Sequence, residues 1–174
     1  MAAPRFAEQL NVQIGNELAA HNQYLACAIH YDALTMPQMA AFFYAQALEE
    51  RAHAMMMVQY LLDTDAEVEI PAVAAPVNEF ADVVAPVALA LEQERRVTEQ
   101  INGLLRIARD ANDFASEQFM QWFIKEQVEE VATMSDLLTV VNRNVDDIED
   151  IEEYVAREQG DDRHDAMAPR IAGA

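Results

Sequence analysis

The sequence predicts an all-α protein: a bundle of four long helices with one long crossover connection and a short fifth helix at the C-terminal end. Three observations support this fold class. Good helix formers are abundant, and the 174 residues include only 4 Gly and 6 Pro. Apolar residues recur at spacings of three and four along four long segments, as in helices with one buried face. One connection is long, whereas the others are short turns.

Local signals place the ends of these helices. Proline disfavours helix at the residue before it, so Met36-Pro37 separates the first helix from the second. Pro86 suits the first turn of the third helix, and Asp113 is the expected N-cap of the fourth. The five predicted helices span about residues 6–34, 38–63, 86–110, 113–142 and 146–159.

The connections predict how the helices pair. Short turns join the first helix to the second and the third to the fourth, so each pair should form an antiparallel hairpin. A helix of about 27 residues is roughly 40 Å long, and about 18 extended residues reach roughly 60 Å. The connection 66–85 can therefore run the length of the bundle and leave the second and third helices parallel. Residues 1–159 are expected to form one domain, and 160–174 a flexible tail.

Composition limits the classes of partner. The chain has 31 acidic against 11 basic residues, a formal net charge of −20. This charge argues against nucleic acid or an anionic membrane and is compatible with attracting cations. A single cysteine, Cys27, excludes an internal disulfide. The start MAAPRF does not resemble a signal peptide, and no segment has the roughly 20 apolar residues of a membrane span. A cytoplasmic location is expected.

Each long helix carries a glutamate near the middle of its predicted buried face. These are Glu17, Glu50, Glu94 and Glu130. Each is a surface residue if its face is drawn one position off, but four such errors at similar depth are less expected. A lone buried carboxylate costs several kcal/mol unless it is paired or binds metal. Few basic residues lie on these faces, so a metal ion is the simplest counter-charge.

One of these glutamates has a histidine neighbour on the same helix face. Glu50 and His53 are three residues apart and can bind one ion together. Glu-x-x-His alone is a weak signal, but together with central glutamates on three other helices it is a strong one. Carboxylates with one imidazole suit iron better than structural zinc, which prefers Cys and His.

Four stretches resemble the non-haem bacterial ferritins, especially the actinobacterial ones. They read NELAAHNQYLA, FFYAQALEERAHAMMMVQYLLD, ALALEQERRVTEQI and EQFMQWFIKEQVEEVATMSDLL. The resemblance covers about residues 6–157 and implies a ferritin-like four-helix bundle. It also implies one iron site on Glu17, Glu50 and His53.

The same resemblance implies a second iron site and a residue beside it. The second iron is expected on Glu94 and Glu130, with Glu50 bridging the two ions and Gln127 alongside. Tyr24 matches the tyrosine next to such centres. The alternative for Tyr24 is a core aromatic residue whose hydroxyl finds an ordinary hydrogen bond partner.

A third, weaker iron site is implied on Glu49, Glu126 and Glu129. The spacing gives some independent support, because Glu126, Glu129 and Glu130 form one continuous patch of helix. The alternative is a solvated acidic helix face.

Haem is not expected. The symmetrical di-iron pattern has a second Glu-x-x-His on the fourth helix, and this chain has Gln127 and Glu130 at those positions. The haem-ligating methionine of bacterioferritins corresponds to Ala52 here. Met55–Met57, one turn further on, are interpreted as packing residues.

The resemblance implies a ferroxidase and iron store. Fe²⁺ and O₂ or H₂O₂ are the expected reactants, and iron is the expected metal. The implied assembly is a homo-oligomeric cage of twenty-four subunits, with the fifth helix at four-fold contacts. Asp110, Asp113 and Glu117 are pore candidates, or else a helix cap and first-turn charges.

Two other functions are compatible with the residues. One is a di-iron peroxidase or oxygenase on the same bundle, which would need a channel for an organic substrate or a site for an electron-transfer partner. The chain has no cysteine cluster for a rubredoxin-type centre, and this weighs against a rubrerythrin. The other is a non-enzymatic acidic helical scaffold whose central glutamates lie on the surface.

Overall fold

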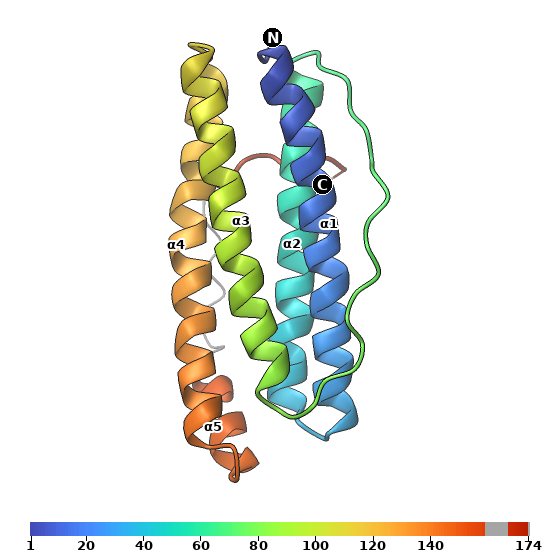
Figure 1. The fold of residues 1–174 in the computed structure, drawn as a ribbon, viewed down its shortest axis with the longest axis vertical. Helices are drawn as coiled ribbons and strands as arrows, with labels where there is room; N and C mark the ends of the chain where they lie inside the picture. Colours follow the sequence, from blue (N-terminus) through green and yellow to red (C-terminus); the bar gives the residue numbers. More distant parts are fainter. Residues whose placement is uncertain (159–166, 174) are drawn as a thin grey trace.

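The computed structural model describes residues 1–158 and 167–173, and five helices make up its regular structure (Figure 1). The helices are α1 Pro4–Ala33, α2 Pro37–Asp63, α3 Ala85–Asp110, α4 Phe114–Arg143 and α5 Ile148–Glu158. Each boundary lies within two residues of the predicted one, and the described residues contain no strand. The predicted all-α class and order of helices are therefore confirmed.

The chain direction follows the predicted topology. Helices α1 and α2 form one antiparallel hairpin, and α3 and α4 form the other (Figure 1). The crossover 64–84 runs back along the outside of the bundle, so α2 and α3 are parallel. Helix α5 lies at one end of the bundle, where the Glu152 carboxylate accepts hydrogen bonds from the N–H groups of Gln38 and Met39 at 2.8 and 2.9 Å. Glu152 therefore caps the start of α2.

The start of α4 is fixed as the sequence predicts. Asp113 is its N-cap, because the Asp113 carboxylate accepts a hydrogen bond from the Ser116 N–H at 3.1 Å. The same carboxylate accepts the Ala3 N–H at 2.8 Å and so attaches the N-terminus of the chain. Glu117 lies in the first turn of α4 and pairs with Arg109 at 2.6 Å. The cap and first-turn roles of Asp113 and Glu117 are thus present, and their role in a pore stays a prediction.

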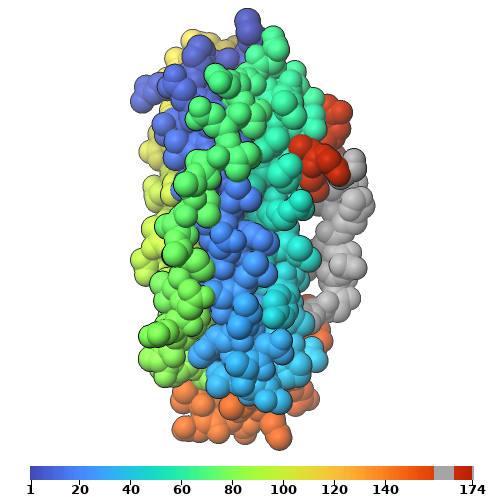
Figure 2. All heavy atoms as spheres, turned by 90° about the vertical axis from the view of Figure 1, so that its right-hand side faces the viewer, coloured from blue at the N-terminus to red at the C-terminus, as the bar shows by residue number. Residues whose placement is uncertain are grey.

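Two side-chain amides of α1 hold the crossover. Asn11 Nδ2 donates to the Glu67 carbonyl at 2.9 Å, and Asn11 Oδ1 accepts the Glu69 N–H at 2.7 Å. Gln23 binds Val77 in the same way, donating to its carbonyl at 2.9 Å and accepting its N–H at 2.8 Å. Each side-chain amide therefore satisfies backbone N–H and C=O groups of the crossover that would otherwise need a neighbouring strand. The crossover lies against α1 over much of its length (Figure 2).

Between these two amides, the crossover touches the backbone of α1. A Cβ atom added at Gly15 would lie only 2.6 Å from Pro71 Cγ. Glycine inside a helix costs about 1 kcal/mol relative to alanine. The close approach of Pro71 accounts for the presence of Gly15 in the middle of α1.

The core consists of two apolar clusters with a polar layer between them. One cluster lies toward the α5 end and includes Tyr31, Phe43 and Met134. The other lies toward the opposite end and includes Phe6, Met57 and Phe123. Met56 and Met57 are buried in the second cluster, and Met55 packs against it, as expected for packing residues. Between the clusters, every long helix contributes buried polar side chains.

The end of the chain returns to α2. The predicted tail 160–174 lies partly outside the described residues, so the domain boundary at residue 159 stays a prediction. Residues 167–173 are described and lie on the α2 side of the bundle (Figure 2). There the Ala172 N–H donates to the Met55 carbonyl at 3.1 Å, and Arg170 pairs with Asp63 at 2.6 Å. Within the described residues, no helix combines the length and the apolar character needed to cross a membrane.

Candidate metal centre

The polar layer gathers the residues that the sequence singled out. All of the predicted ligands of the first and second sites are buried there, and Tyr24 is buried beside them. The layer consists of Glu17 from α1, Glu50 and His53 from α2, Glu94 from α3, and Gln127 and Glu130 from α4. The surface alternative for the four central glutamates is therefore excluded.

Three of these side chains form a compact group. Glu17, Glu50 and His53 each offer a ligand atom, and these atoms lie within 4.8 Å of one another. His53 Nδ1 is 3.6 Å from Glu50 Oε2. The imidazole also packs edge-on against Trp122 and Phe123, with ring centroids 5.6 and 5.9 Å away. This packing fixes the ring on the side that faces the carboxylates.

The other half of the layer is held by hydrogen bonds around Glu94. The Tyr24 hydroxyl donates to the Glu94 carboxylate. Gln127 Nε2 donates to Glu94 Oε2 at 3.4 Å, and Gln127 Oε1 accepts the Thr98 hydroxyl at 2.9 Å. Glu130 is buried one turn further along α4. The second half, made of Glu94, Gln127 and Glu130, therefore contains two carboxyl groups and one amide but no imidazole.

The buried carboxyl groups of the layer have raised pKa values. Burial raises the pKa of Glu17, Glu50 and Glu130 well above the ordinary range, and neighbouring carboxylates raise each pKa further. Burial also raises the pKa of Glu94 to about 7, although hydrogen bonds from Tyr24 and Gln127 oppose the rise. Without a cation these groups therefore keep their protons to higher pH than exposed carboxyl groups do, and a bound metal ion would displace such protons.

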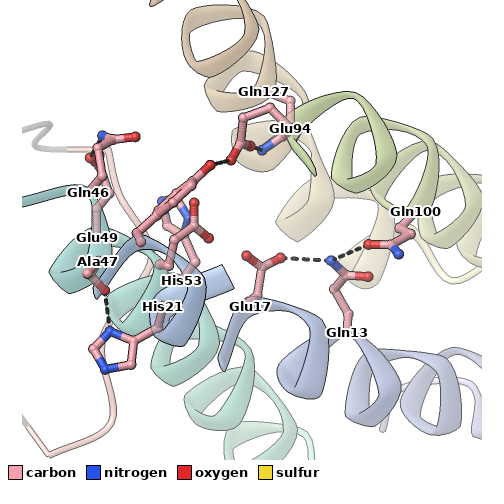
Figure 3. Close-up of polar contacts among 12 residues, drawn as sticks. Gln13, Glu17, His21, Gln46, Ala47, Glu49, His53, Glu94, Gln100 and Gln127 are labelled. Atoms are coloured by element: carbon pink, nitrogen blue, oxygen red, sulfur yellow. Dashed lines mark hydrogen bonds and ion pairs between the residues drawn. The ribbon is translucent and has the colours of Figure 1, made fainter. Parts of the chain in front are cut away.

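A second group of possible ligands lies next to the first. Glu49, His53 and Glu126 also bring ligand atoms within 4.8 Å of one another, and His53 belongs to both groups. Glu49 and Glu126 are half-buried, and Gln46 Nε2 donates to Glu49 Oε2 at 2.8 Å (Figure 3). Partial burial raises the pKa of Glu126, whereas nearby His53 opposes the rise.

Glu129 is not part of this group. It is exposed, and its carboxylate lies 3.6 Å from Lys125 Nζ. Of the three residues predicted for a third site, the structure thus brings together Glu49 and Glu126 and leaves Glu129 at the rim.

Sequence reasoning missed three polar residues around the layer. Gln13, Gln46 and Thr98 hydrogen-bond to Glu17, Glu49 and Gln127 respectively. The apolar spacing predicts a buried face of α2 through Phe43, Gln46 and Glu50, and one of α3 through Glu94, Thr98 and Ile101, so Gln46 and Thr98 could have been found from their positions. The predicted face of α1 runs through Leu10, Ile14 and Glu17 and leaves out Gln13, so only its place one turn before Glu17 connects Gln13 with the site.

Four helices that project carboxylates into one shared buried layer are typical of the ferritin-like class of proteins. The chain belongs to the ferritin family, because the ferritin-like domain of that family matches residues 7–144. The resemblance to non-haem ferritins that the sequence indicates is thereby confirmed.

Individual relatives agree with this assignment. The chain is 52% identical over 169 residues to Ferritin BfrB of Mycolicibacterium smegmatis, which covers 97% of this chain and 93% of that protein. It is 35% identical over 147 residues to the bacterial non-heme ferritin of Staphylococcus aureus, covering 84% and 89%. Among solved structures, the open pore ferritin of Archaeoglobus fulgidus superposes with a TM-score of 0.85 at 28% identity, covering 90% and 97%.

Proposed function

We propose that this protein oxidises Fe²⁺ to Fe³⁺ in the buried polar layer and stores the product as ferric mineral inside a cage built from copies of the chain. Family membership and the ferritin names of its relatives support iron storage. The observation that carries the oxidation step is the buried group of Glu17, Glu50 and His53, with ligand atoms within 4.8 Å.

The ligand set favours oxidation by charge. Anionic carboxylate oxygens stabilise Fe³⁺ more than Fe²⁺, because the extra positive charge interacts more strongly with them in a buried site. Two Fe²⁺ ions release two electrons, and with two protons these reduce O₂ to H₂O₂. With H₂O₂ as oxidant, the same two electrons and two protons yield two water molecules. Carboxyl groups that lose protons on binding Fe²⁺ supply such protons locally.

Each half of the layer would bind one of the two iron ions. Glu17, Glu50 and His53 would hold the first ion, and Glu94, Glu130 and Gln127 would hold the second. Glu50 is suited to bridge the two ions, because its carboxylate lies 3.6 Å from His53 Nδ1 and the negative charge of Glu94 raises its pKa. The second ion has no imidazole ligand, so we expect it to be held less firmly and to leave more readily for the mineral.

Two neighbouring features belong to the same proposal. Tyr24 would hold Glu94, the proposed ligand of the second ion, in place through its hydrogen bond to that carboxylate. Glu49 and Glu126 would bind a third iron, with Glu129 contributing from the rim.

The cage accounts for the acidic excess of the chain. A net charge of −20 per subunit would create a strongly negative assembly that attracts cations. We infer a cage of twenty-four copies, in which the short α5 takes part in contacts between subunits.

Aerobic oxidation of Fe²⁺, followed by ferric absorbance, tests the centre. Glu50→Ala and His53→Ala each remove a ligand of the first ion and should slow the fast phase at least ~10-fold. Glu92→Ala is the matched control, since Glu92 is exposed on α3 and pairs with Arg96 at the surface. A fast phase that survives both ligand variants would place the oxidation site elsewhere.

Size-exclusion chromatography with an iron assay after Fe²⁺ loading tests storage. We expect iron to elute with a large assembly of the unmodified protein. Elution of the loaded protein as a monomer or dimer would contradict the cage, whatever the oxidation rate.

A further inference from the structure

Gln13 is a buried polar residue next to the metal centre that has no place in the proposed chemistry. It lies on α1, one turn before Glu17, and is only 2% exposed. Its Nε2 donates to Glu17 Oε1 at 2.8 Å and to Gln100 Oε1 at 3.2 Å. Its own Oε1 accepts a hydrogen bond from Asn16 Nδ2 at 3.0 Å. Figure 3 shows Gln13 between Glu17 and Gln100, joined to both.

These three contacts determine which way the amide points. In the reverse orientation, the Gln13 oxygen would face the oxygens of Glu17 and Gln100, and its NH₂ group would face the Asn16 NH₂ group. Like groups would then meet at all three contacts. The Gln13 NH₂ group thus points at Glu17 Oε1 in an arrangement that the Asn16 and Gln100 amides, as they are oriented, support.

The hydrogen bond from Gln13 acts on one oxygen of Glu17 only. Glu17 Oε1 is held on the side of Gln13 and Gln100, that is, toward α3. The same carboxyl group lies beside Glu50 and His53, with ligand atoms within 4.8 Å of one another. A carboxylate restrained in this way binds a metal ion through one oxygen, whereas a freely rotating carboxylate can chelate through both.

We propose that Gln13 is a positioning residue that presents Glu17 to the first metal ion as a single-oxygen ligand. This inference rests on the proposed function, because it requires an ion at Glu17, Glu50 and His53. Partners of this kind, which contact a ligand and not the metal, typically change metal affinity 10–100-fold when they are removed.

Gln13→Met tests the proposal, because methionine has a similar length and no N–H donor. Co²⁺ replaces iron, since it is stable in air and its visible absorption reports coordination number and geometry. We expect Co²⁺ bound to Gln13→Met to show a changed visible spectrum and at least ~10-fold weaker binding at the first site. Asn16→Leu leaves Gln13 in place but removes the contact that orients it, so it should change the spectrum in the same direction.

Gln23→Met is the matched control. Gln23 is also on α1, is 7% exposed and uses its amide for hydrogen bonds, but these go to Val77 in the crossover and to the Cys27 sulfur. This variant should lose stability and keep the Co²⁺ spectrum and affinity of the unmodified protein. A purely structural role of Gln13 would make the two Gln→Met variants behave alike.

The outcomes separate the two proposals. Glu17→Ala should abolish binding of the first Co²⁺; if the unmodified protein shows no binding that depends on Glu17, the proposed function itself fails. If that binding exists and Gln13→Met leaves its spectrum and affinity unchanged, the positioning role is wrong and the function stands. If Gln13→Met does not fold, the spectrum of Asn16→Leu decides by the same criterion.

Discussion

Glu94 and Tyr24 form a buried pair in which the carboxylate disfavours ionisation of the phenol, whereas the phenol's hydrogen bond favours the charged carboxylate. Tyr24 is a hydrogen bond donor to Glu94. Burial raises the pKa of Tyr24 well above its usual value, and the charge of Glu94 raises it further. The phenol therefore keeps its proton at neutral pH and remains a donor. The pKa of Glu94 is nevertheless about 7, so burial outweighs the hydrogen bonds that favour its charged form.

The metal-free protein should lose stability as pH rises from about 5 to about 7. Folded Glu94 keeps its proton up to a pKa of about 7, whereas in the unfolded chain the proton leaves near 4.5. The folded state thus binds more protons in this window, and the free energy of unfolding falls with rising pH. Within this window Glu94 alone accounts for on the order of 2 kcal/mol. Urea unfolding in the presence of EDTA measures the slope.

A matched substitution isolates this effect. Glu94→Gln keeps the shape of the side chain and removes its titration, so the decrease in stability between pH 5 and 7 should be smaller. Asp113 does not compensate, because hydrogen bonds from Ser116 and Ala3 lower its already acidic pKa despite partial burial. Stability that rises over this pH range would contradict the assignment of Glu94 as a buried acid.

At the scale of residues, the sequence identified the buried carboxyl groups of the layer better than their hydrogen bond partners. Glu17 and Glu50 could be predicted because a charged residue inside an apolar helical spacing is conspicuous. Gln13 could not, because one of its hydrogen bond partners, Gln100, is 87 positions away in the sequence. Helical periodicity records which side of a helix is buried and does not record which side chain from another helix meets it.

Among the elements, α1 and the crossover are fitted to each other at Gly15. Alanine forms helix better than glycine by about 1 kcal/mol, yet a methyl group here would overlap with Pro71 Cγ at 2.6 Å. Displacement of Pro71 would also strain the amide contacts of Asn11 and Gln23 on either side. The helix and the crossover must therefore separate or distort if the glycine is replaced.

Gly15→Ala should lower the free energy of unfolding by about 1–3 kcal/mol, as overpacking usually does. Gly103→Ala is the control, because Gly103 is also inside a helix but a Cβ there would meet nothing within 4 Å. That substitution should stabilise the protein by up to about 1 kcal/mol. Urea unfolding of both variants measures whether each substitution lowers or raises the free energy of unfolding. Equal effects of the two substitutions would show that Pro71 does not restrict position 15.

Helix boundaries were accessible from sequence because their signals are local. Pro37, Pro86 and Asp113 mark three starts, and each acts within one turn of its own position. The path of the crossover was accessible only as a length. Its attachment depends on side chains of α1 that bond to backbone 54 to 58 positions away, and no local pattern predicts such contacts.

The whole molecule is two hairpins that meet at the polar layer. Burial of the carboxylates between them is unfavourable without protons or a cation. A metal ion that binds the folded layer and not the unfolded chain therefore stabilises the protein by mass action.

Zn²⁺ provides a test of this stabilisation without redox chemistry. At pH 7 and at about 100 times its dissociation constant, Zn²⁺ should raise the free energy of unfolding by about 2.7 kcal/mol per site. EDTA should reverse the effect, and pH 5 should weaken it because protons compete for the carboxylates. Thermal unfolding measures the shift, and Glu17→Ala should reduce it whereas Glu92→Ala should not. A shift that is equal in both variants would place the stabilising ion outside the layer.

Each hairpin carries one half of the polar layer, and this division has a consequence for the route of folding. Contacts within a hairpin join segments that are close along the chain, so each hairpin can form early. Docking of the hairpins is the step that joins distant segments, and it is also the step in which the carboxylates of both halves lose water. We therefore expect the buried carboxyl groups of the layer to place an electrostatic barrier at this docking step, and refolding rates with and without Zn²⁺ would measure it.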